Sequence, residues 1–368
     1  NVLSAGITST YNTGWMNGDI KGAFLSDTDD TDLVGSGELV TNGTFDTDTD
    51  WTDKLTGSTG GSVVITGGEL VITQGSNSVW MGAAQAIDVT NVDLVVLSGD
   101  LISKSSAGAV RLGISNTDIE TAVPNFGYVN MSVGNNTVTA DVSSLSTAYV
   151  VVMDGQAAGE NSHIDNISVK LADADRSVNN NGLVVTGSIA RDPVSSGADL
   201  VAYSGFSASN YLEQPYNPDL DFGTGDFCVM GWVKVLAAGT TIIDRGDGAT
   251  RTWRFISPST GEIQWDFRDG VSRTTVVSAN FPSGQWFLAC GTREGSEVKL
   301  YINGSLISTG SLGSSVDVDT ASNAVLRVGE KASTTVFAPL SGSLALLRIS
   351  ATAPTAEQIA KIYNDEKV

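Results

Sequence analysis

Carboxylates spaced along one short segment are the first candidates for chemistry in this sequence. The segment EIQWDFRDG contains Glu262, Asp266 and Asp269, and paired carboxylates act as acid and base in enzymes that cleave glycosidic bonds. Side chains alternate between the two faces of a strand, so Glu262 and Asp266 would share one face and the apolar residues between them the other. A half-buried strand has this pattern without any catalytic role. We therefore interpret the acids as a solvated face and not as a catalytic pair.

Histidine chemistry is almost absent from the chain. His163 is the single histidine, and it lies far in the sequence from the acidic segment. Ser-His-Asp and Cys-His sites each need a histidine, and many zinc sites need several. We therefore predict that the protein is not an enzyme.

Aromatic side chains offer better support for binding than the acids do for catalysis. The seven Trp and eight Tyr residues could stack on sugar rings. We expect most of these rings to belong to the core. The candidate ligand-binding residues, in less determined surroundings, are Trp80, Tyr128, Trp253 and Arg254.

The charge of the chain limits its partners. Lys and Arg number 20 against 41 Asp and Glu, which gives a formal net charge of −21. Such a surface repels phosphate backbones and anionic lipids, so we expect neither nucleic-acid binding nor membrane insertion. The two cysteines, Cys228 and Cys290, lie in apolar alternating stretches, and we favour small core residues over a disulfide. The chain begins at Asn1 without a visible signal peptide, so we expect a processed product or a fragment.

These residues have to be positioned by strands. Short alternating runs separated by Gly, Asn, Asp and Ser fill residues 34–172 and again 173–368, which predicts an all-β fold of two tandem β-sandwiches. Residues 1–33 read as a short β-unit that completes a preceding module, packs on the next one or acts as a linker. Asn303-Gly304 predicts a type I′ hairpin turn. Residues 354–363 predict one C-terminal helix, with Thr355 and Gln358 as a capping box.

The first sandwich resembles the carbohydrate-binding jelly-roll modules. The matching text is NGTFDTDTDW near its start, with Asn42, Asp46 and Trp51, and IDNI near its end, with Asp165. The resemblance implies that the two ends meet around a structural calcium, with Asn42, Asp46 and Asp165 as the candidate ligands. The alternative is that Asp46 caps a turn and Asp165 faces solvent.

The second sandwich resembles the laminin-G/concanavalin A-like fold. The matching positions are an FCVMGWV strand, a Trp-opened strand, a KLYING hairpin and a closing strand that leads into a short helix; they place Trp232, Trp286, Tyr301 and Tyr363. Where that family often has an acidic residue before the closing helix, this chain has GSLALL. A calcium or sugar site at that end of the fold is therefore not expected.

A third resemblance concerns the context of the chain. The connector ARDPVSSGADLVAYSGFSASNY, together with GDIKGAFLSDT, resembles fibre or appendage proteins of marine tailed phages. It implies a virion-surface or extracellular adhesion protein that recognises a glycan or host cell-surface receptor. Such a protein would also contact neighbouring virion proteins and form a homo-oligomer such as a trimer. Two alternatives stay open: an accessory module of a secreted polysaccharide-degrading enzyme, and a purely structural fibre or filament protein.

Overall fold

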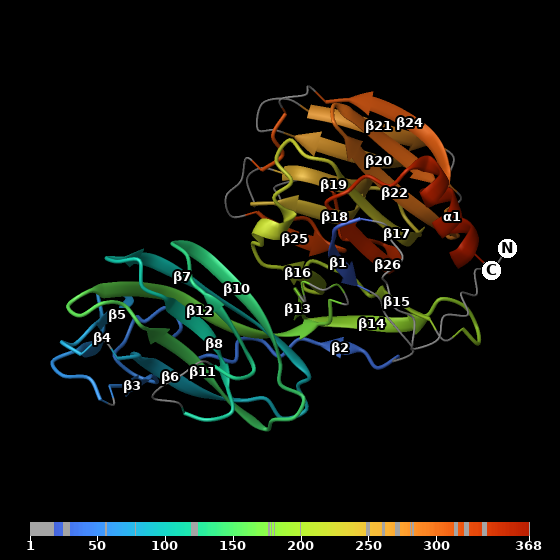
Figure 1. Ribbon diagram of the computed structural model, residues 1–368. Helices are drawn as coiled ribbons and strands as arrows, with labels where there is room; N and C mark the ends of the chain where they lie inside the picture. The colour runs from blue at the N-terminus through green and yellow to red at the C-terminus, as the bar shows by residue number, and fades with distance from the viewer. Residues whose placement is uncertain are drawn as a thin grey trace. The chain divides into compact units, whose positions relative to one another are not determined.

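The structure is a computed structural model of the 368-residue chain. It describes residues 18–24, 30–55, 57–77, 79–118, 124–175, 177, 179, 181–198, 200–247, 251–259, 262–268, 273–279, 281, 283–312, 316–319, 324–332 and 337–367. The chain forms two compact units (Figure 1). We call residues 36–172 the first sandwich, and residues 1–35 with 173–368 the second sandwich.

Two antiparallel sheets form the first sandwich. One sheet has the strand order β3-β6-β11-β8-β9, and the other contains β10-β7-β12-β5-β4. The strands are β3 (Thr52–Lys54), β4 (Ser62–Thr66), β5 (Glu69–Thr73), β6 (Met81–Asp88), β7 (Leu94–Lys104), β8 (Val110–Ser115), β9 (Gly127–Asn130), β10 (Gly134–Asp141), β11 (Thr147–Asp154) and β12 (Asn161–Asp173).

The alternation of β11 explains how this sandwich has both a core and a second, outer face. Val150 and Val152 are fully buried in the core between the sheets. Tyr149 and Met153 lie on the opposite side of the strand, in a small separate cluster. A strand whose two faces are both partly apolar needs cover on its outer face, which becomes important for the candidate site below.

The second sandwich also has two sheets. One has the order β2-β14-β15-β26-β17-β22-β23-β24, with β1 on β26, and the other contains β13-β16-β25-β18-β19-β20-β21. The elements are β1 (Ile20–Phe24), β2 (Leu33–Val34), β13 (Leu183–Thr186), β14 (Ser188–Pro193), β15 (Val201–Ser204), β16 (Tyr211–Gln214), the 3₁₀ turn η1 (Pro218–Leu220), β17 (Phe227–Val235), β18 (Thr240–Gly246), β19 (Arg251–Ser257), β20 (Glu262–Arg268), β21 (Arg273–Ala279), β22 (Trp286–Glu294), β23 (Glu297–Ile302), β24 (Ser305–Ser311), β25 (Val325–Val328), β26 (Gly342–Ser350) and the helix α1 (Ala356–Glu366).

An aromatic cluster fills the space between these sheets. The Trp265 ring stacks on Phe255 with centroids 4.4 Å apart and meets Phe227 edge-on at 5.9 Å. On the other face of β17, a second apolar layer lies beneath α1, where Ile359 and Ile362 pack with Trp232 and other buried side chains. Figure 1 shows α1 beside the sheet that contains β17 and β22. The predicted all-β fold with one C-terminal helix is therefore confirmed.

Local predictions about turns and caps are confirmed as well. Thr355 accepts a hydrogen bond from the Gln358 N–H, and the Gln358 side chain returns one to the Thr355 N–H, which completes the capping box. Asn303 and Gly304 both have positive φ, at 51° and 78°, between β23 and β24. Among the described residues, no helix is both long and apolar enough to cross a membrane.

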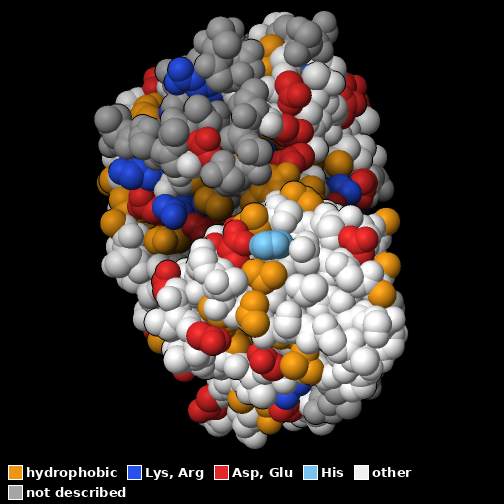
Figure 2. Space-filling model, turned by 90° about the vertical axis from the view of Figure 1, so that its left-hand side faces the viewer, with side chains coloured by type: hydrophobic (Ala, Val, Ile, Leu, Met, Phe, Trp, Pro, Cys, Tyr) orange, Lys and Arg blue, Asp and Glu red, His pale blue; other side chains and the backbone are white. Residues whose placement is uncertain are grey.

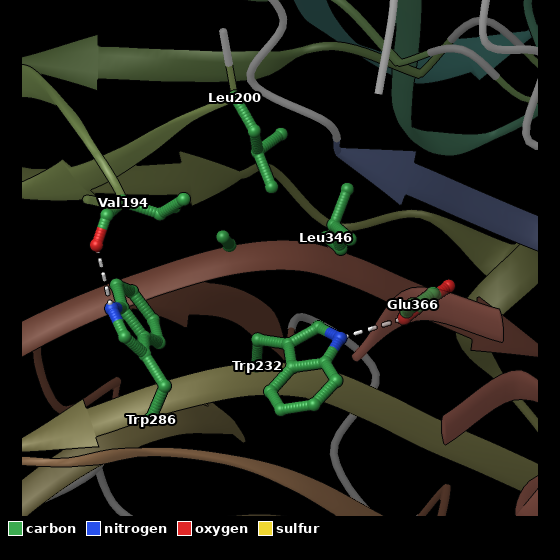
Figure 3. Close-up of a pocket in the computed structure, with 7 residues that line it drawn as sticks. Val194, Leu200, Trp232, Trp286, Leu346 and Glu366 are labelled. Carbon is green, nitrogen blue, oxygen red and sulfur yellow. Dashed lines mark hydrogen bonds between the residues drawn. The ribbon is translucent and has the colours of Figure 1, made fainter. Parts of the chain in front are cut away.

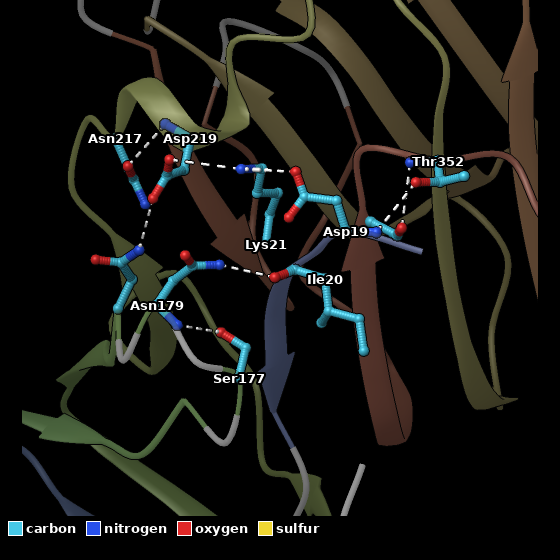
Figure 4. Close-up of polar contacts among 10 residues, drawn as sticks. Asp19, Ile20, Lys21, Ser177, Asn179, Asn217, Asp219 and Thr352 are labelled. Atoms are coloured by element: carbon cyan, nitrogen blue, oxygen red, sulfur yellow. Dashed lines mark hydrogen bonds and ion pairs between the residues drawn. The ribbon is translucent and has the colours of Figure 1, made fainter. Parts of the chain in front are cut away.

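The segment at the start of the chain pairs with the last strand of the second sandwich. The expectation for residues 1–33 was a β-unit that completes a preceding module, packs on the next one or acts as a linker, and the role of this segment stays a prediction. Within it, β1 pairs with β26. Lys21 contacts Asp19 at 3.1 Å and Asp219 at 3.8 Å, and the Asn179 side chain donates to the Ile20 carbonyl (Figure 4). Asp219 and Asn179 lie far from this segment in the sequence, so local patterns could not reveal these two contacts.

Candidate functional site

The outer face of the sheet β3-β6-β11-β8-β9 in the first sandwich gathers aromatic and basic side chains. In β8, Val110, Leu112 and Ile114 are buried in the core, so Arg111 lies on the outer face. Arg111 is opposite Asn130 of β9. Tyr128 precedes Asn130 by two residues on β9, so it lies on the same face of the sheet. Trp80 comes just before β6 and packs against the cluster on this face. We call Trp80, Arg111, Tyr128 and Asn130 the outer-face cluster.

The Arg111 guanidinium connects the two rings of the cluster. Its central carbon lies 4.2 Å from the Trp80 ring centroid and 5.0 Å from that of Tyr128. Its Nε donates to the Asn130 Oδ1 at 3.1 Å. A cation over an aromatic face is stabilised by the ring quadrupole, so these contacts fix the guanidinium on the sheet.

Close packing holds Trp80 in place. A Cβ added at Gly155 would lie 2.8 Å from the Trp80 ring, so the absence of a side chain there lets the indole approach the backbone. Tyr149 and Met153 of β11 complete the apolar surface around it. Tyr128 is 37% exposed, which leaves ring surface available to a ligand.

A second cation lies on the same sheet face but is neutralised. Lys54 of β3 lies opposite Gly82 of β6. Gly82 is two positions from Ala84, which is on the outer face, so Lys54 lies on that face as well. Its ammonium pairs with the Asp118 carboxylate at 2.6 Å, and its side chain is 5% exposed. Arg111 differs from Lys54 because it forms no ion pair with a carboxylate of the described residues.

The sequence predicted two of the four residues of this cluster. Trp80 and Tyr128 were predicted independently, and the structure brings both to one guanidinium. Arg111 and Asn130 were missed. The alternation in AVRLGIS already places Arg111 opposite to the buried positions, but no sequence pattern places it beside Trp80, which lies on another strand connection.

Trp253 and Arg254 require a correction. Trp253 is fully buried in the aromatic cluster of the second sandwich, with its ring centroid 5.8 Å from that of Trp265. Arg254 is 2% exposed, and its Nε donates to Asp266 at 2.9 Å. Neither side chain is accessible to a ligand, because the sheet packs over the indole and an ion pair occupies the guanidinium.

The acids of β20 also differ from their predicted setting. The apolar residues of this strand face the core as expected, but Asp266 is fully buried and not solvated. It ends a row of alternating charges that are opposite one another across five strands: Glu213, Arg327, Asp244, Arg254 and Asp266. Glu262 accepts a hydrogen bond from Ser259, and Asp269 lies outside the described residues. A buried ion-paired Asp266 is a structural group in this arrangement.

The single histidine is at the surface of the first sandwich. His163 Nδ1 lies 2.7 Å from Glu69 Oε2, and each side chain is 31% exposed. Figure 2 shows the ring on the surface. His163 and Glu69 therefore form a pair at the surface of the first sandwich.

The two motifs expected to close the first sandwich do meet. The Ile167 N–H donates to the Gly43 carbonyl at 2.9 Å, and a Cβ on Gly43 would lie 1.9 Å from the Ile167 oxygen. Asp165 has a raised pKa, first because of burial and then because Asp100, Glu69 and Asp46 add negative charge nearby. The ends of the motif therefore form one acidic junction.

The calcium ligands predicted at this junction fit the structure only in part. Both functional groups of the Asn42 side chain are used locally, since its amide donates to the Thr47 and Thr49 carbonyls and its oxygen accepts from the Thr47 N–H. Asp46 accepts from the Thr44 hydroxyl. Among the described residues, no group of three or more His, Cys, Asp or Glu side chains is arranged to hold a metal ion. Asn42 thus acts as a turn residue, and calcium here stays a prediction.

The cysteines and a pocket belong to the apolar layers of the second sandwich. Cys228 and Cys290 are buried and free, with their sulfur atoms 3.5 Å apart. A small pocket is lined mainly by apolar residues around Trp232 and Trp286 (Figure 3). The Trp286 N–H donates to the Val194 carbonyl and the Trp232 N–H to Glu366. With these donors engaged, the pocket offers an apolar surface.

Comparison with known proteins supports the fold of the second sandwich. Residues 206–360 match the family described as the concanavalin A-like lectin/glucanases superfamily. A search of the curated proteins found no match.

Solved structures give weaker similarities. One is the binding domain of botulinum neurotoxin DC in complex with SialylT, at 16% identity and a TM-score of 0.40 over 53% of this chain and 48% of that one. The same toxin domain in complex with rat synaptotagmin II has 15% identity and a TM-score of 0.39, over 53% and 49% of the two chains. The chain thus spans about half the length of these toxin domains.

A third similarity is to the Ruminococcus gnavus IT-sialidase CBM40 bound to alpha2,3 sialyllactose, at 13% identity and a TM-score of 0.36 over 44% of this chain and 93% of that one. Similarities at this level assign no ligand to the present chain. The family match does extend through β17–β26 and into the start of α1, so the second sandwich contains a concanavalin A-like domain.

Proposed function

We propose that this protein is a non-enzymatic binding protein whose first sandwich recognises a glycan through the outer-face cluster. The observation that carries the proposal is that Trp80 and Tyr128 lie around Arg111 on one partly exposed sheet face. Flat apolar rings next to fixed polar donors suit a sugar, because its ring presents an apolar face and a rim of hydroxyl groups. The match of the second sandwich to a superfamily that includes lectins supports the same class of ligand.

The biological setting that we propose is adhesion. The resemblance of the connector and the N-terminal segment to phage fibre proteins supports a virion-surface or extracellular appendage that contacts a host receptor and neighbouring virion proteins. A homo-oligomer such as a trimer would multiply weak contacts into strong attachment. Sedimentation equilibrium of the full chain tests this part, and a monomer at all concentrations would contradict it.

A glycan screen tests the binding proposal. The full chain is screened against neutral and acidic polysaccharides, with calcium and with EDTA, and hits are measured by calorimetry. We expect Trp80→Ala and Tyr128→Ala each to weaken binding by about tenfold, or ~1.4 kcal/mol, because each removes a stacking ring.

Tyr211→Ala is the matched control for this screen. Tyr211 also contacts a guanidinium, that of Arg327 at 4.5 Å, but it lies in the second sandwich. It should leave binding unchanged. Absence of binding to every glycan by the folded, assembled protein would favour the structural fibre alternative, and a catalytic domain in the same gene would favour the accessory-module alternative.

A further inference from the structure

The hydrogen bonding of the Arg111 side chain indicates which class of ligand the outer-face cluster can bind. Arginine has five N–H donors, and the structure uses one of them, the Nε–H that donates to Asn130. The two terminal amino groups of Arg111 make no hydrogen bond or ion pair with any residue that the structure describes. They are the groups that bind a carboxylate with two parallel hydrogen bonds.

Two other arginines of this chain are paired with acids. Arg327 contacts the Tyr211 ring but is also paired with Glu213 at 2.7 Å, and Arg348 is paired with Glu366 at 2.5 Å. In a protein with 41 acidic and 20 basic residues, an arginine could find an acid easily. Arg111 contacts two aromatic rings and an amide. Among the residues that the structure describes, no acid neutralises its binding edge.

The rings also reduce the entropic cost of binding. An arginine side chain free in solvent loses rotamer freedom when it captures a ligand, whereas contacts with Trp80, Tyr128 and Asn130 already restrict Arg111. A planar guanidinium fixed in this way favours a planar acceptor over a single hydroxyl group.

We infer that the outer-face cluster binds an acidic polysaccharide of the uronic-acid class, with Arg111 binding the carboxylate while Trp80 or Tyr128 stacks on the sugar ring. The inference rests on the proposed glycan-binding function and specifies its ligand. A uronic acid supplies both partners in one residue, an apolar ring face and a carboxylate at the ring edge. Arg111 is then the residue that determines specificity for acidic over neutral sugars.

The net charge gives the interaction an unusual salt dependence. At −21 the protein repels a polyanion at long range, although Arg111 attracts a carboxylate at contact. Salt screens the long-range repulsion more than the contact pair. Raising the ionic strength from a low value is therefore expected to increase the association rate, which is opposite to the behaviour of a basic protein with the same ligand.

The test uses polygalacturonate and alginate, each beside its carboxyl-reduced derivative, which has the same backbone without the charge. The full chain should bind the acidic forms at least about tenfold more tightly than the reduced forms, because charge-assisted bidentate bonds are lost on reduction. Arg111→Gln should abolish this preference and keep the weak binding to reduced polymer. Arg111→Lys, with a charge but no planar fork, should retain only part of it.

Lys170→Gln is the control for charge, since it removes one positive charge from the first sandwich on β12 of the other sheet. It should keep the preference, and circular dichroism should show that every variant is folded. Equal binding of acidic and reduced forms, or an unchanged preference in Arg111→Gln, would overturn the uronic-acid inference while leaving glycan binding intact. Binding to no polysaccharide of either kind would overturn both proposals.

Discussion

Single buried or crowded carboxylates determine how this acidic protein responds to pH. Asp319 has a pKa raised to about 6, chiefly by burial and by the nearby charge of Asp221, against the opposing effect of Arg245. One of its oxygens also accepts a hydrogen bond from the Gly223 N–H. An acid whose pKa is higher in the folded state destabilises that state once it ionises.

The sign of this effect gives a pH-dependent prediction. Between pH 3.8 and about 6 the folded protein binds more protons at Asp319 than the unfolded chain, so its contribution to stability falls as pH rises through this window. Asp319→Asn removes the penalty and can still accept from Gly223. We expect it to stabilise the second sandwich by about 1–2 kcal/mol at pH 7–8, after allowance for solvent screening, and by little near pH 4.

Calorimetry of the full chain across this pH range measures the difference. Asp192→Asn, which removes one carboxylate at an exposed position of the same sandwich, is the control for the loss of a charge. A gain from Asp319→Asn that is equal at pH 4 and pH 8 would contradict the assignment.

The acidic junction of the first sandwich provides a second residue-scale prediction, concerning calcium. Without metal, Asp165→Asn should raise the melting temperature at neutral pH, because the ionised form of Asp165 is disfavoured by burial and by three neighbouring carboxylates. If calcium binds there as the resemblance implies, calcium should raise the melting temperature of the natural chain and not that of the variant. Equal calcium effects on the two proteins would remove Asp165 from the set of ligands.

At the scale of elements, the helix α1 is held to the sheet by a buried polar contact as well as by apolar packing. Glu366 accepts from the Trp232 indole of β17 at 2.7 Å and pairs with Arg348 of β26. Its side chain is fully buried, and that of Arg348 is 3% exposed. The last turn of the helix is therefore bound to two neighbouring strands at once.

Removing this carboxylate should be costly. Glu366→Ala is expected to destabilise the second sandwich by about 3–5 kcal/mol, because the buried Arg348 charge loses its carboxylate partner. The adjacent Asp365 pairs with Lys361 on the helix surface, so Asp365→Ala should cost no more than about 0.5 kcal/mol. Denaturant unfolding of both variants measures the contrast, and similar small effects would mean that α1 does not depend on the Glu366 contact.

At the scale of the whole molecule, the sequence of the first sandwich is inserted between two segments of the sequence that forms the second. The polypeptide passes between the two units at residues 35–36 and again at 172–173. Each sandwich has its own hydrophobic core. Units with separate cores are expected to unfold separately.

Calorimetry should accordingly show two transitions that respond to different substitutions. Gly43→Ala places a Cβ against the Ile167 carbonyl and should lower the transition of the first sandwich, by about 1–3 kcal/mol for overpacking of this kind. Glu366→Ala should lower the other transition. If each variant shifts both transitions equally, the two sandwiches unfold as one cooperative unit.

The local patterns of the sequence determined the class of fold and many of its details. Period-two alternation predicted strands and their apolar faces, as in β20, and side-chain chemistry predicted the Thr355 capping box and the Asn303-Gly304 turn. These features depend on residues within a few positions of one another, and their energetics are local. The motif near Asn42 also predicted its meeting with the last strand of the first sandwich, through the resemblance that it has to a known module.

Tertiary structure alone decided which side chains a ligand could reach. Alternation shows that two residues lie on opposite faces of a strand but not which outer face is covered by other parts of the chain. Trp253 and Asp266 are therefore buried, while Trp80 and Tyr128 meet Arg111 on a partly exposed face. Exposure and cross-strand contact depend on segments far apart in the sequence, and for that reason the ligand-binding candidates could be placed only when the sheets were assembled.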